Sequence, residues 1–347
     1  MFNEEIIENI LKKEDFFRSC KIKRIEILNR IETPLSVIYR IHLEYHTKTT
    51  IPTYFILKMF KMSTRSDLIE KYGHNEVVFY EKIALLNNNY PIVKCYNTNY
   101  LYRDNYYLLL EDKTSFCINI CRPILPSKTN ILKSINSLFS LHNTWLNHQL
   151  LGHEIGVIYN EITIKEYVRM HELIYLNFIY NAPSLLDCKL KNEIEFILNN
   201  LSKVYLRLTN RLNQTLIHGD AHLWNFLYPI DIKADKAIFI DWQNWKICIP
   251  TNDLAYMLSL HLNENDFDFE KKMIKYYFNM LKANYIHYAW EDFDFDYKLS
   301  IIKVIFTPFW QFYQNVDSSI WTNYIKKIPF LYRMYSLKEY VSNIRNI

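Results

Sequence analysis

Glycine is scarce in this chain: only four of the 347 residues are glycine. No segment combines glycine with serine or proline in the way that flexible linkers do, and no internal repeat or low-complexity stretch is present. Hydrophobic residues make up 50% of the sequence and charged residues 22%, which is typical of a globular protein and excludes a disordered one. A length of 347 residues is long for one compact core and ordinary for two unequal lobes.

The sequence also has no large excess of positive or negative charge and no long apolar segment. The formal net charge is only +4, and basic residues do not gather into an arm, which argues against a nucleic-acid partner. The uncharged run 173–186 is too short to span a bilayer and is interrupted by Asn177, Asn181 and Pro183. The first residues are acidic and lack the charge pattern of a signal peptide. We therefore expect no membrane segment and a cytoplasmic location.

Cysteine is not arranged for metal binding. The six cysteines lie at positions 20, 95, 117, 121, 188 and 248, and only Cys117 and Cys121 are close in sequence. No second pair and no nearby set of histidines completes a zinc site. Free, mostly buried thiols are expected, as in a reducing cytosol.

One polar cluster is present near the middle of the chain. In the segment 216–222, with the sequence Leu-Ile-His-Gly-Asp-Ala-His, Asp220 follows one of the four glycines. Asn225 comes after four intervening residues, so one loop can present a carboxylate and an amide to the same group. Sixteen residues later, Asp241 follows an apolar stretch, 237–240, that is typical of a short buried strand.

These residue types suit the transfer of a phosphoryl group. That reaction needs alignment and neutralisation of charge more than covalent help from the protein. One carboxylate accepts or orients the proton of the attacking hydroxyl, and Asp220 is the candidate. Mg²⁺ prefers hard oxygen ligands, so Asn225 and Asp241 are the predicted metal ligands, together with phosphate oxygens and water. Protein kinases space their catalytic Asp and metal-binding Asn in the same way and have a later metal-binding Asp.

Two other interpretations of this cluster remain open. An isolated His-Gly-Asp is most often an ordinary turn, although the positions of Asn225 and Asp241 favour phosphoryl transfer. A metal-dependent hydrolase could use His218, Asp220 and His222 as ligands. Such sites usually need a further group of His or carboxylate ligands, and the remaining histidines are scattered.

The first third of the chain offers groups that could hold a nucleotide. Residues 53–60 are rich in aromatic and β-branched residues and predict a strand, with Lys58 inside its apolar run. The helical pattern that follows places Glu76, Tyr80 and Ile83 on one face. A carboxylate on an inward face needs a partner, so we predict a Lys58–Glu76 pair with the ammonium group near the α- and β-phosphates.

A β-hairpin is predicted next. Two apolar runs flank a polar turn at Asp104-Asn105, the first at 99–102 and the second at 106–110. The second run continues into Glu111-Asp112-Lys113, a polar step suited to a hinge between lobes. Backbone groups of such a hinge can hydrogen-bond the edge of an adenine ring.

Taken together, these segments resemble the aminoglycoside phosphotransferase and choline kinase superfamily, relatives of protein kinases that phosphorylate small molecules. They look closest to its ecdysteroid kinase-like branch. The motifs that carry the resemblance lie at residues 76–80, 109–112, 141–145, 218–222, 240–243 and 253–256. The resemblance extends from about residue 25 to the C-terminus.

The resemblance implies an α+β, two-lobed protein-kinase-like fold. Residues 1–112 would form a nucleotide-binding N-lobe, a small antiparallel β-sheet with one main helix. Residues 113–347 would form a larger, mostly helical C-lobe for catalysis and acceptor binding. Helical periodicity over 129–146, 162–182 and 189–212, and again from residue 253 onward, agrees with this division.

The resemblance also implies roles for individual residues, with ATP and Mg²⁺ as cofactors. It makes Asp220 the catalytic base, Asn225 and Asp241 the magnesium ligands, Lys58 and Glu76 the ion pair, and Glu111 a residue near the adenine. Asp253 matches a family acid that braces the catalytic loop, and its plain alternative is an acid that interacts with a helix dipole. Trp242 and Trp245 follow the metal acid closely and are candidate acceptor contacts, whereas most other tryptophans are expected in the core.

One segment departs from the superfamily pattern. The phosphate-covering loop usually contains glycine, which lets backbone amides approach phosphate closely, but residues 28–40 contain none. The hydroxyl groups of Thr33 and Ser36 would have to contribute instead, or the segment is a plain hairpin turn set by Pro34. The sequence thus predicts a small-molecule kinase with a hydroxyl group as acceptor. A catalytically weak or inactive kinase-like binding protein is the alternative.

Overall fold

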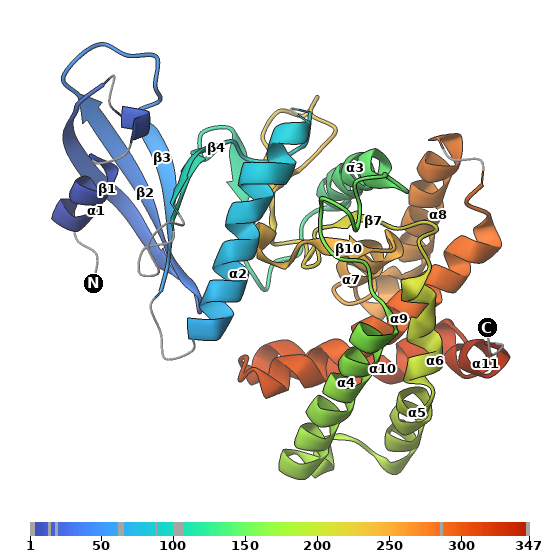
Figure 1. Cartoon of the computed structure of the whole chain (residues 1–347). Helices are drawn as coiled ribbons and strands as arrows, with labels where there is room; N and C mark the ends of the chain where they lie inside the picture. Colours follow the sequence, from blue (N-terminus) through green and yellow to red (C-terminus); the bar gives the residue numbers. More distant parts are fainter. Residues whose placement is uncertain are drawn as a thin grey trace. The chain divides into compact units, whose positions relative to one another are not determined.

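The chain forms two compact units. The structure, a computed structural model, describes residues 4–12, 15–17, 20–61, 66–87, 89–99, 107–284 and 287–344 (Figure 1). The first unit comprises Met1–Leu125 and Trp224–Trp245, and the second comprises Pro126–Leu223 and Lys246–Ile347. Each unit is made of two segments that are separate in sequence, because Trp224–Trp245 packs with the N-terminal part of the chain. The functional division expected at residue 112 stays a prediction.

A five-stranded antiparallel sheet forms most of the first unit. Its strands run in the order β1 (Ile22–Glu32), β2 (Ser36–Tyr45), β3 (Tyr54–Phe60), β5 (Tyr107–Glu111) and β4 (Cys95–Asn99). All four neighbouring pairs are antiparallel, as predicted. β4 comes earlier than the expected run 99–102, and the expected turn at Asp104-Asn105 lies outside the described residues.

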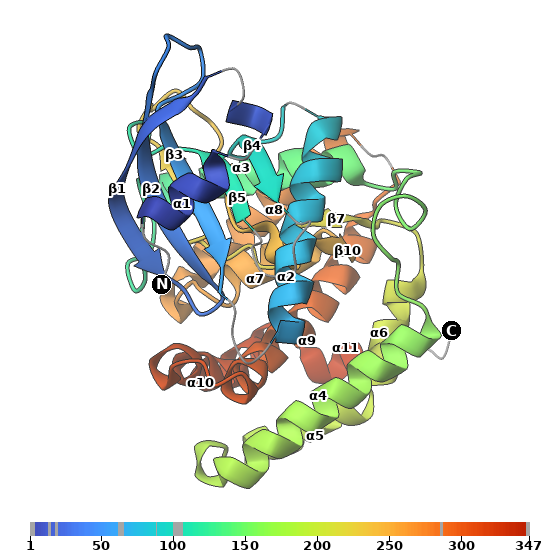
Figure 2. The same cartoon turned by 60° about the vertical axis from the view of Figure 1, so that its left-hand side comes forward.

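The core of this sheet follows from the two-residue period of its strands. Alternate residues of a strand point to opposite faces, and one face is almost completely buried. Its residues include Tyr39, Ile41 and Leu43 of β2, Phe55, Leu57 and Met59 of β3, and Tyr107 and Leu109 of β5. Helix α1 (Glu4–Leu11) adds Ile7 and Leu11 to the same cluster and lies across β1 and β2 (Figure 2).

The predicted helix of the first unit is present as α2 (Ser66–Val78). It continues into a π-helical turn, Phe79–Ile83, and a short 3-10 turn, Ala84–Leu86. Glu76, Tyr80 and Ile83, which the sequence placed on one face, are all buried.

A second, three-stranded sheet completes the first unit. It pairs β6 (Cys117–Asn119), β8 (Phe226–Pro229) and β9 (Ile238–Phe239) in the order β6-β8-β9. β9 is the predicted strand before Asp241, shortened to two residues. In the β8–β9 ladder Phe226 lies opposite Phe239, and the amide of Ile240 donates to the carbonyl oxygen of Asn225 at 3.1 Å. This pairing brings two segments that are distant in sequence, each next to a predicted metal ligand, to the same end of the sheet.

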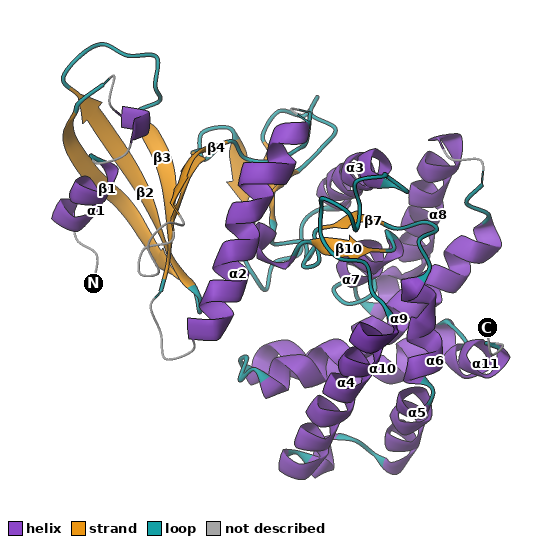
Figure 3. Cartoon of the chain, viewed as in Figure 1, coloured by secondary structure: helices purple, strands orange, loops and turns teal. Residues whose placement is uncertain are grey.

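The second unit is mainly helical (Figure 3). Its helices are α3 (Lys128–Trp145), α4 (Glu161–Asn181), α5 (Cys188–Asn199), α6 (Leu201–Tyr205), α7 (Thr251–Leu258), α8 (Phe267–Asn284), α9 (Trp290–Tyr313), α10 (Ser318–Met334) and α11 (Leu337–Asn343). Two short antiparallel strands, β7 (Thr215–Ile217) and β10 (Lys246–Cys248), pair with each other. The α+β fold class predicted from the sequence is confirmed.

The helix boundaries have local causes. Ser127 caps α3 by accepting from the amide of Asn130, and Asn160 forms a capping box with Thr163 at the start of α4. The single helix expected over 189–212 is wrong, because the chain leaves helical geometry at Asn200. The Asn200 side chain donates to the carbonyl oxygen of Phe196, and such local bonds compete with the helix.

The structure also describes the state of the cysteines and the character of the helices. None of the six cysteines, all of which lie within the described ranges, forms a disulfide, and three of them are buried. Among the described helices, none combines the length and the apolar character that crossing a bilayer requires.

Candidate active site

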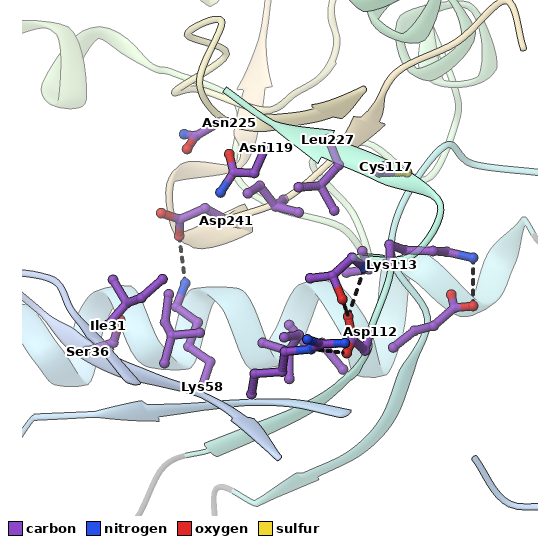
Figure 4. A pocket seen from close by; sticks show the side chains of 18 of the residues that line it. Ile31, Ser36, Lys58, Asp112, Lys113, Cys117, Asn119, Asn225, Leu227 and Asp241 are labelled. Atoms are coloured by element: carbon purple, nitrogen blue, oxygen red, sulfur yellow. Dashed lines mark hydrogen bonds and ion pairs between the residues drawn. The ribbon is translucent and has the colours of Figure 1, made fainter. Parts of the chain in front are cut away.

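The first unit contains a cavity of about 450 Å³ (Figure 4). Side chains from both of its sheets line this cavity. They include six of the seven site residues predicted from the sequence, namely Ser36, Lys58, Glu76, Glu111, Asn225 and Asp241. These six residues are therefore neighbours, although they come from five separate parts of the chain.

Lys58 links two carboxylates at one end of this cavity. Its Nζ lies 2.6 Å from Oε2 of Glu76 and 2.8 Å from Oδ1 of Asp241. Lys58 is 6% exposed and Glu76 is fully buried. Burial alone would lower the pKa of Lys58, but the two carboxylates outweigh it and raise that pKa. The ammonium group is thus charged at neutral pH and points toward Asp241, as the dashed line in Figure 4 shows.

Glu76 is a weaker acid than an exposed glutamate. Burial raises the pKa of its carboxyl group, against the attraction of Lys58, which lowers it. The pair predicted from the helical face is present. It is anchored from both sides, by β3 through Lys58 and by α2 through Glu76.

Asp241 has an unusual backbone conformation. Its φ is 68°, in the left-handed region that non-glycine residues rarely adopt. The turn that follows is fixed to α2, because Nδ2 of Asn75 donates to the carbonyl oxygens of Gln243 at 2.8 Å and of Trp245 at 3.2 Å. The direction of the Asp241 side chain is therefore set by contacts on both sides of it.

The two tryptophans after Asp241 pack against the same helix and its continuation. The ring of Trp242 stacks on Phe79 with centroids 3.7 Å apart, and the indole Nε1 of Trp245 donates to the carbonyl oxygen of Asn75 at 2.6 Å. Trp242 is fully buried and Trp245 is 7% exposed. Their observed contacts support the Asp241 turn, in place of the acceptor contact suggested by their sequence positions.

Asn225 and Asp241 have oxygen donors that suit Mg²⁺. Figure 4 shows both side chains at the same end of the cavity, together with Asn119. One carboxylate and one amide supply only part of a magnesium shell, and Mg²⁺ usually keeps waters and phosphate oxygens as its other ligands. Among the described residues, no three His, Cys, Asp or Glu side chains are grouped to hold a metal ion by themselves. The donor set fits a metal that is bound together with a phosphate group.

The other end of the cavity is formed by the predicted hinge. Glu111 accepts a hydrogen bond from Nζ of Lys113 at 2.6 Å, and Asp112 accepts one from Nε of Arg40 at 2.6 Å. Thr114 donates twice to the same Asp112 carboxylate. Burial opposes ionisation of Asp112, but the bonds from Thr114 and Arg40 hold its pKa below the usual value.

The glycine-free loop forms a tight turn between β1 and β2. The amide of Thr33 donates to the carbonyl oxygen of Ser36, and the amide of Ser36 donates to Oγ1 of Thr33, each at 2.9 Å. The two hydroxyl groups are also hydrogen-bonded to each other at 2.8 Å. The hairpin turn considered as the alternative is therefore present, and both of its hydroxyl-bearing residues line the cavity.

Sequence reasoning did not single out several polar residues that line this cavity, among them Arg40 and Asn119. Arg40 shares the strand face of Ser36 and Ile38, so the two-residue period of β2 could have identified it. Asn119 lies on β6, a strand of three residues, and no sequence pattern marked it.

Asp220 belongs to the second unit. It follows β7 in a loop whose turn is made by Gly219, which has a φ of 79°. Glycine adopts this left-handed conformation without the penalty that a Cβ atom brings. The amide of Asp220 donates to Nδ1 of His218 at 3.3 Å, and Oδ2 of Asp220 lies 3.9 Å from Nε2 of His222. The Asp220 side chain is 21% exposed, so its carboxylate can be reached from outside the core.

Asp253 braces this loop from the first turn of α7. Its fully buried carboxylate accepts from the amides of His218 at 2.7 Å and Gly219 at 2.9 Å. Nε2 of His142 lies 3.2 Å from Oδ2, and Nδ1 of His142 lies 2.6 Å from the hydroxyl of Tyr277. Burial acts to raise the pKa of Asp253, but these bonds and the nearby histidines lower it overall. The brace implied by the family resemblance is confirmed.

The family and the fold are shown by comparison with known proteins. The family model described as "Ecdysteroid kinase-like family" matches residues 31–289. Choline kinase LicA from Streptococcus pneumoniae is 15% identical, with a TM-score of 0.53, 95% of this chain covered and 99% of that one. Choline kinase from Cryptosporidium parvum is 11% identical, with a TM-score of 0.58 and coverage of 99% and 98%.

An ethanolamine kinase from Plasmodium vivax is 14% identical, with a TM-score of 0.55, 91% of this chain covered and 83% of that one. No curated protein sequence matches. At these identities the solved structures show the fold, which is kinase-like, and the family model covers most of the chain. The resemblance drawn from the motifs is confirmed, and the chain belongs to the ecdysteroid kinase-like family.

Proposed function

We propose that this protein is an ATP- and Mg²⁺-dependent kinase that transfers the γ-phosphoryl group of the nucleotide to a hydroxyl group of a small molecule. The observation that carries the proposal is the pair of contacts made by Lys58, to Glu76 and to Asp241, at one end of the cavity. A lysine held by a helix carboxylate beside a metal-binding acid is the arrangement with which protein kinases hold nucleotide phosphates. The cavity volume of about 450 Å³ lies within the usual range for small-molecule sites.

The nucleotide would be oriented by groups at both ends of this cavity. Backbone groups of the hinge after β5 would bind the adenine, with Glu111 beside it. Lys58 would contact the α- and β-phosphates, and the Ser36 hydroxyl would lie along the phosphates. Asn225 and Asp241 would hold Mg²⁺, which supplies neutralisation of phosphate charge when bound.

Asp220 would take the proton of the acceptor. The acceptor oxygen bonds to the γ-phosphorus, the bond from that phosphorus to the β–γ bridging oxygen breaks, and ADP leaves. The hydroxyl proton passes to a carboxylate oxygen of Asp220. The bonds that Asp253 accepts from the backbone of His218 and Gly219 keep this loop in one conformation, which preserves the alignment that phosphoryl transfer requires.

One observation favours a weaker activity or a binding function. The amide of Ser36 is already bonded to Thr33 Oγ1, so the β1–β2 turn offers phosphate fewer backbone donors than a glycine-rich loop does. A protein that binds nucleotide weakly and transfers no phosphate is the second candidate.

The decisive experiment compares the parent protein with Asp220→Asn. Nucleotide binding is followed as thermal stabilisation by ATP with Mg²⁺, and transfer is followed with labelled ATP across amino alcohols, sterols, sugars and aminoglycosides. We expect Asp220→Asn to retain ATP binding and to lose transfer. Transfer at the parental rate by Asp220→Asn overturns its role as the base.

A further result separates the two candidate functions. If millimolar ATP with Mg²⁺ does not stabilise the parent protein, the kinase proposal fails and the binding function without catalysis takes its place. The hydrolase alternative predicts a metal-dependent phosphatase activity that His222→Ala abolishes and Asn225→Ala leaves intact. We expect no such activity.

A further inference from the structure

Two lysines of the second unit lie on the same side of β10, the partner of the strand that leads to Asp220. Lys246 begins β10 and lies opposite Ile217, the last residue of β7, three positions before Asp220. Lys303 of α9 places its Nζ 3.6 Å from Sγ of Cys248, which is two residues after Lys246. Alternate residues of a strand share a face, so both ammonium groups lie on the Cys248 side of β10.

Two tyrosines from another part of the unit complete the surroundings. Nζ of Lys303 lies 5.9 Å from the ring centroid of Tyr167 on α4, and the ring of Tyr159 lies 5.9 Å from that of Tyr167. Within the part of the chain that the structure describes, the strongest electrostatic influences on Lys246 come from these two tyrosines, Cys248 and Lys303. Tyrosine and cysteine side chains are ordinarily neutral at pH 7. The cluster formed by Lys246, Lys303, Tyr159 and Tyr167, called the lysine–tyrosine cluster below, is therefore purely cationic.

Several other cations of restricted exposure have a carboxylate partner, which these two lysines do not have among the described residues. Within the described ranges, neither Lys246 nor Lys303 forms an ion pair. By contrast, Lys58 is paired with Glu76 and Asp241, Arg40 with Asp112, and Arg207 with Asp296.

The electrostatics of the cluster favour an anion. Both lysines are half-buried, so part of their hydration is lost, and two like charges in one region repel each other. An anion placed beside both ammonium groups would remove the repulsion and form short charge-assisted hydrogen bonds. A purely structural explanation is that the apolar stems pack while the ammonium groups stay in water. The first explanation predicts that an anion binds to the cluster, and the second predicts that none does.

We propose that the lysine–tyrosine cluster binds an anionic group of the acceptor: a carboxylate, a sulfate or a phosphate. The assignment to the acceptor rests on the proposed kinase function and on the position of Lys246 beside the strand that leads to Asp220. The chain from Ile217, which lies opposite Lys246, to Asp220 spans at most about 11 Å, so the cluster lies in the same region of the second unit as Asp220. The acceptor would present a hydroxyl to Asp220 and an anion to the lysines. The acceptor class is a hydroxy acid, or an alcohol that already carries a sulfate or phosphate, and not a cationic amino alcohol.

The first experiment measures anion binding without catalysis. The parent chain, the double variant Lys246→Met/Lys303→Met and the control Lys165→Met are titrated with sodium sulfate, phosphate and acetate at constant ionic strength while thermal unfolding is followed. Methionine keeps the apolar stem and removes the charge, and Lys165 is an exposed lysine on α4. We expect at least one anion to stabilise the parent and the control, and to leave the double variant with only the general salt effect. Equal stabilisation of all three proteins overturns the proposal.

The second experiment measures transfer from labelled ATP to matched acceptors. Each hydroxy acid is tested beside its methyl ester, and each sulfated or phosphorylated alcohol beside the unmodified alcohol. We expect kcat/KM to favour the anionic member by about tenfold or more, mainly through KM. Lys303→Arg should keep this preference and Lys303→Met should lose it. A parental preference for the neutral members, or a preference that survives in the double variant, contradicts the site.

The same samples separate failure of this site from failure of the kinase function. Stabilisation by ATP with Mg²⁺ should be equal in the parent and the double variant, because the lysine–tyrosine cluster contains no residue of the nucleotide cavity. If ATP binds nowhere and no phosphate is transferred, the kinase proposal fails, whereas the anion titration still decides whether the cluster is a binding site.

Discussion

Asn75 and Trp245 hold each other by two hydrogen bonds that run in opposite directions. The indole Nε1 of Trp245 donates to the carbonyl oxygen of Asn75, and Nδ2 of Asn75 donates to the carbonyl oxygen of Trp245. Asn75 directly precedes Glu76 on α2, and Trp245 lies four residues after Asp241. The clamp therefore fixes, relative to each other, the two carboxylates that share Lys58. Protein kinases control the position of the corresponding helix, whereas here hydrogen bonds between Asn75 and Trp245 tie α2 to the segment after Asp241.

Asn75→Ala tests this clamp. The substitution removes the side-chain donor, and each lost hydrogen bond costs about 0.5–1.5 kcal/mol, so we expect a fall of about 1–3 kcal/mol in the free energy of unfolding. We also expect weaker binding of ATP with Mg²⁺, because Asp241 loses its fixed direction. Urea unfolding and nucleotide titration measure the two effects. Trp245→Phe, which removes the donor and replaces the indole by a smaller aromatic ring, should show the same pattern. Reduced stability with unchanged nucleotide affinity and transfer would leave the clamp a purely structural role.

Lys58→Met should lower the free energy of unfolding more than Glu76→Gln does. Lys58→Met leaves the fully buried Glu76 without a countercharge, and an uncompensated buried charge typically costs about 3–5 kcal/mol. Glu76→Gln leaves Lys58 with Asp241, so we expect a smaller loss. The double variant should be more stable than Lys58→Met alone, because it removes the stranded carboxylate. Chemical unfolding measures the free energy of unfolding of the three variants. Equal losses in the two single variants would contradict the prediction.

The sequence predicted which side chains of the first unit would lie together around the cavity, because their signals are local. A lysine within an apolar strand, a carboxylate on a buried helix face and acids next to short strands can each be recognised from their neighbours. The antiparallel sheet of the first unit was predicted from the family resemblance, and its strand order comes from the structure. What the sequence could not supply was the partnership of Asn75 with Trp245, since 170 residues separate the two and neither belongs to a pattern.

Two errors show where local signals fail. Continuous periodicity over 189–212 predicted one helix, but the side chain of Asn200 offers the backbone a competing hydrogen bond and the helix ends there. Trp242 was a candidate acceptor contact because it follows Asp241, yet it stacks on Phe79 in the core. The sequence correctly places Trp242 next to Asp241, but it does not show which way the Trp242 side chain points. That orientation depends on the left-handed backbone conformation of Asp241.

Gly219→Ala tests whether the left-handed turn before Asp220 is required for the proposed transfer. An alanine at a φ of 79° adopts a left-handed conformation that costs about 1–2 kcal/mol, and the loop can relax only by giving up its bonds to Asp253. We expect a modest loss of stability and a loss of transfer of tenfold or more, because Asp220 is the next residue. Gly156→Ala is the matched control, since Gly156 also has a positive φ, of 62°, but lies in a different loop. It should lose comparable stability and keep full transfer. If Gly219→Ala loses no more activity than the control, the loop conformation is not essential.

His171 should make stability depend on pH in the mildly acidic range. Burial lowers the pKa of this imidazole to about 4, and the positive charge of Lys303 adds to the shift, although the hydrogen bond to the carbonyl oxygen of Tyr167 opposes it. The unfolded chain binds a proton at His171 below its ordinary pKa of about 6.5, while the folded chain does not until about pH 4. Stability is therefore fully present above pH 6.5 and falls as the pH drops toward 4.

The size of this effect follows from the same difference. Each pH unit between the two pKa values removes at most about 1.4 kcal/mol from the free energy of unfolding, so the full effect is about 3 kcal/mol. His171→Gln cannot be protonated in this range and should lose this part of the pH dependence while the contribution of the acidic residues stays. Urea unfolding of both proteins between pH 7 and pH 4 measures the difference. Parallel curves for the parent and His171→Gln would mean that the imidazole gains its proton in the folded state as easily as in the unfolded chain.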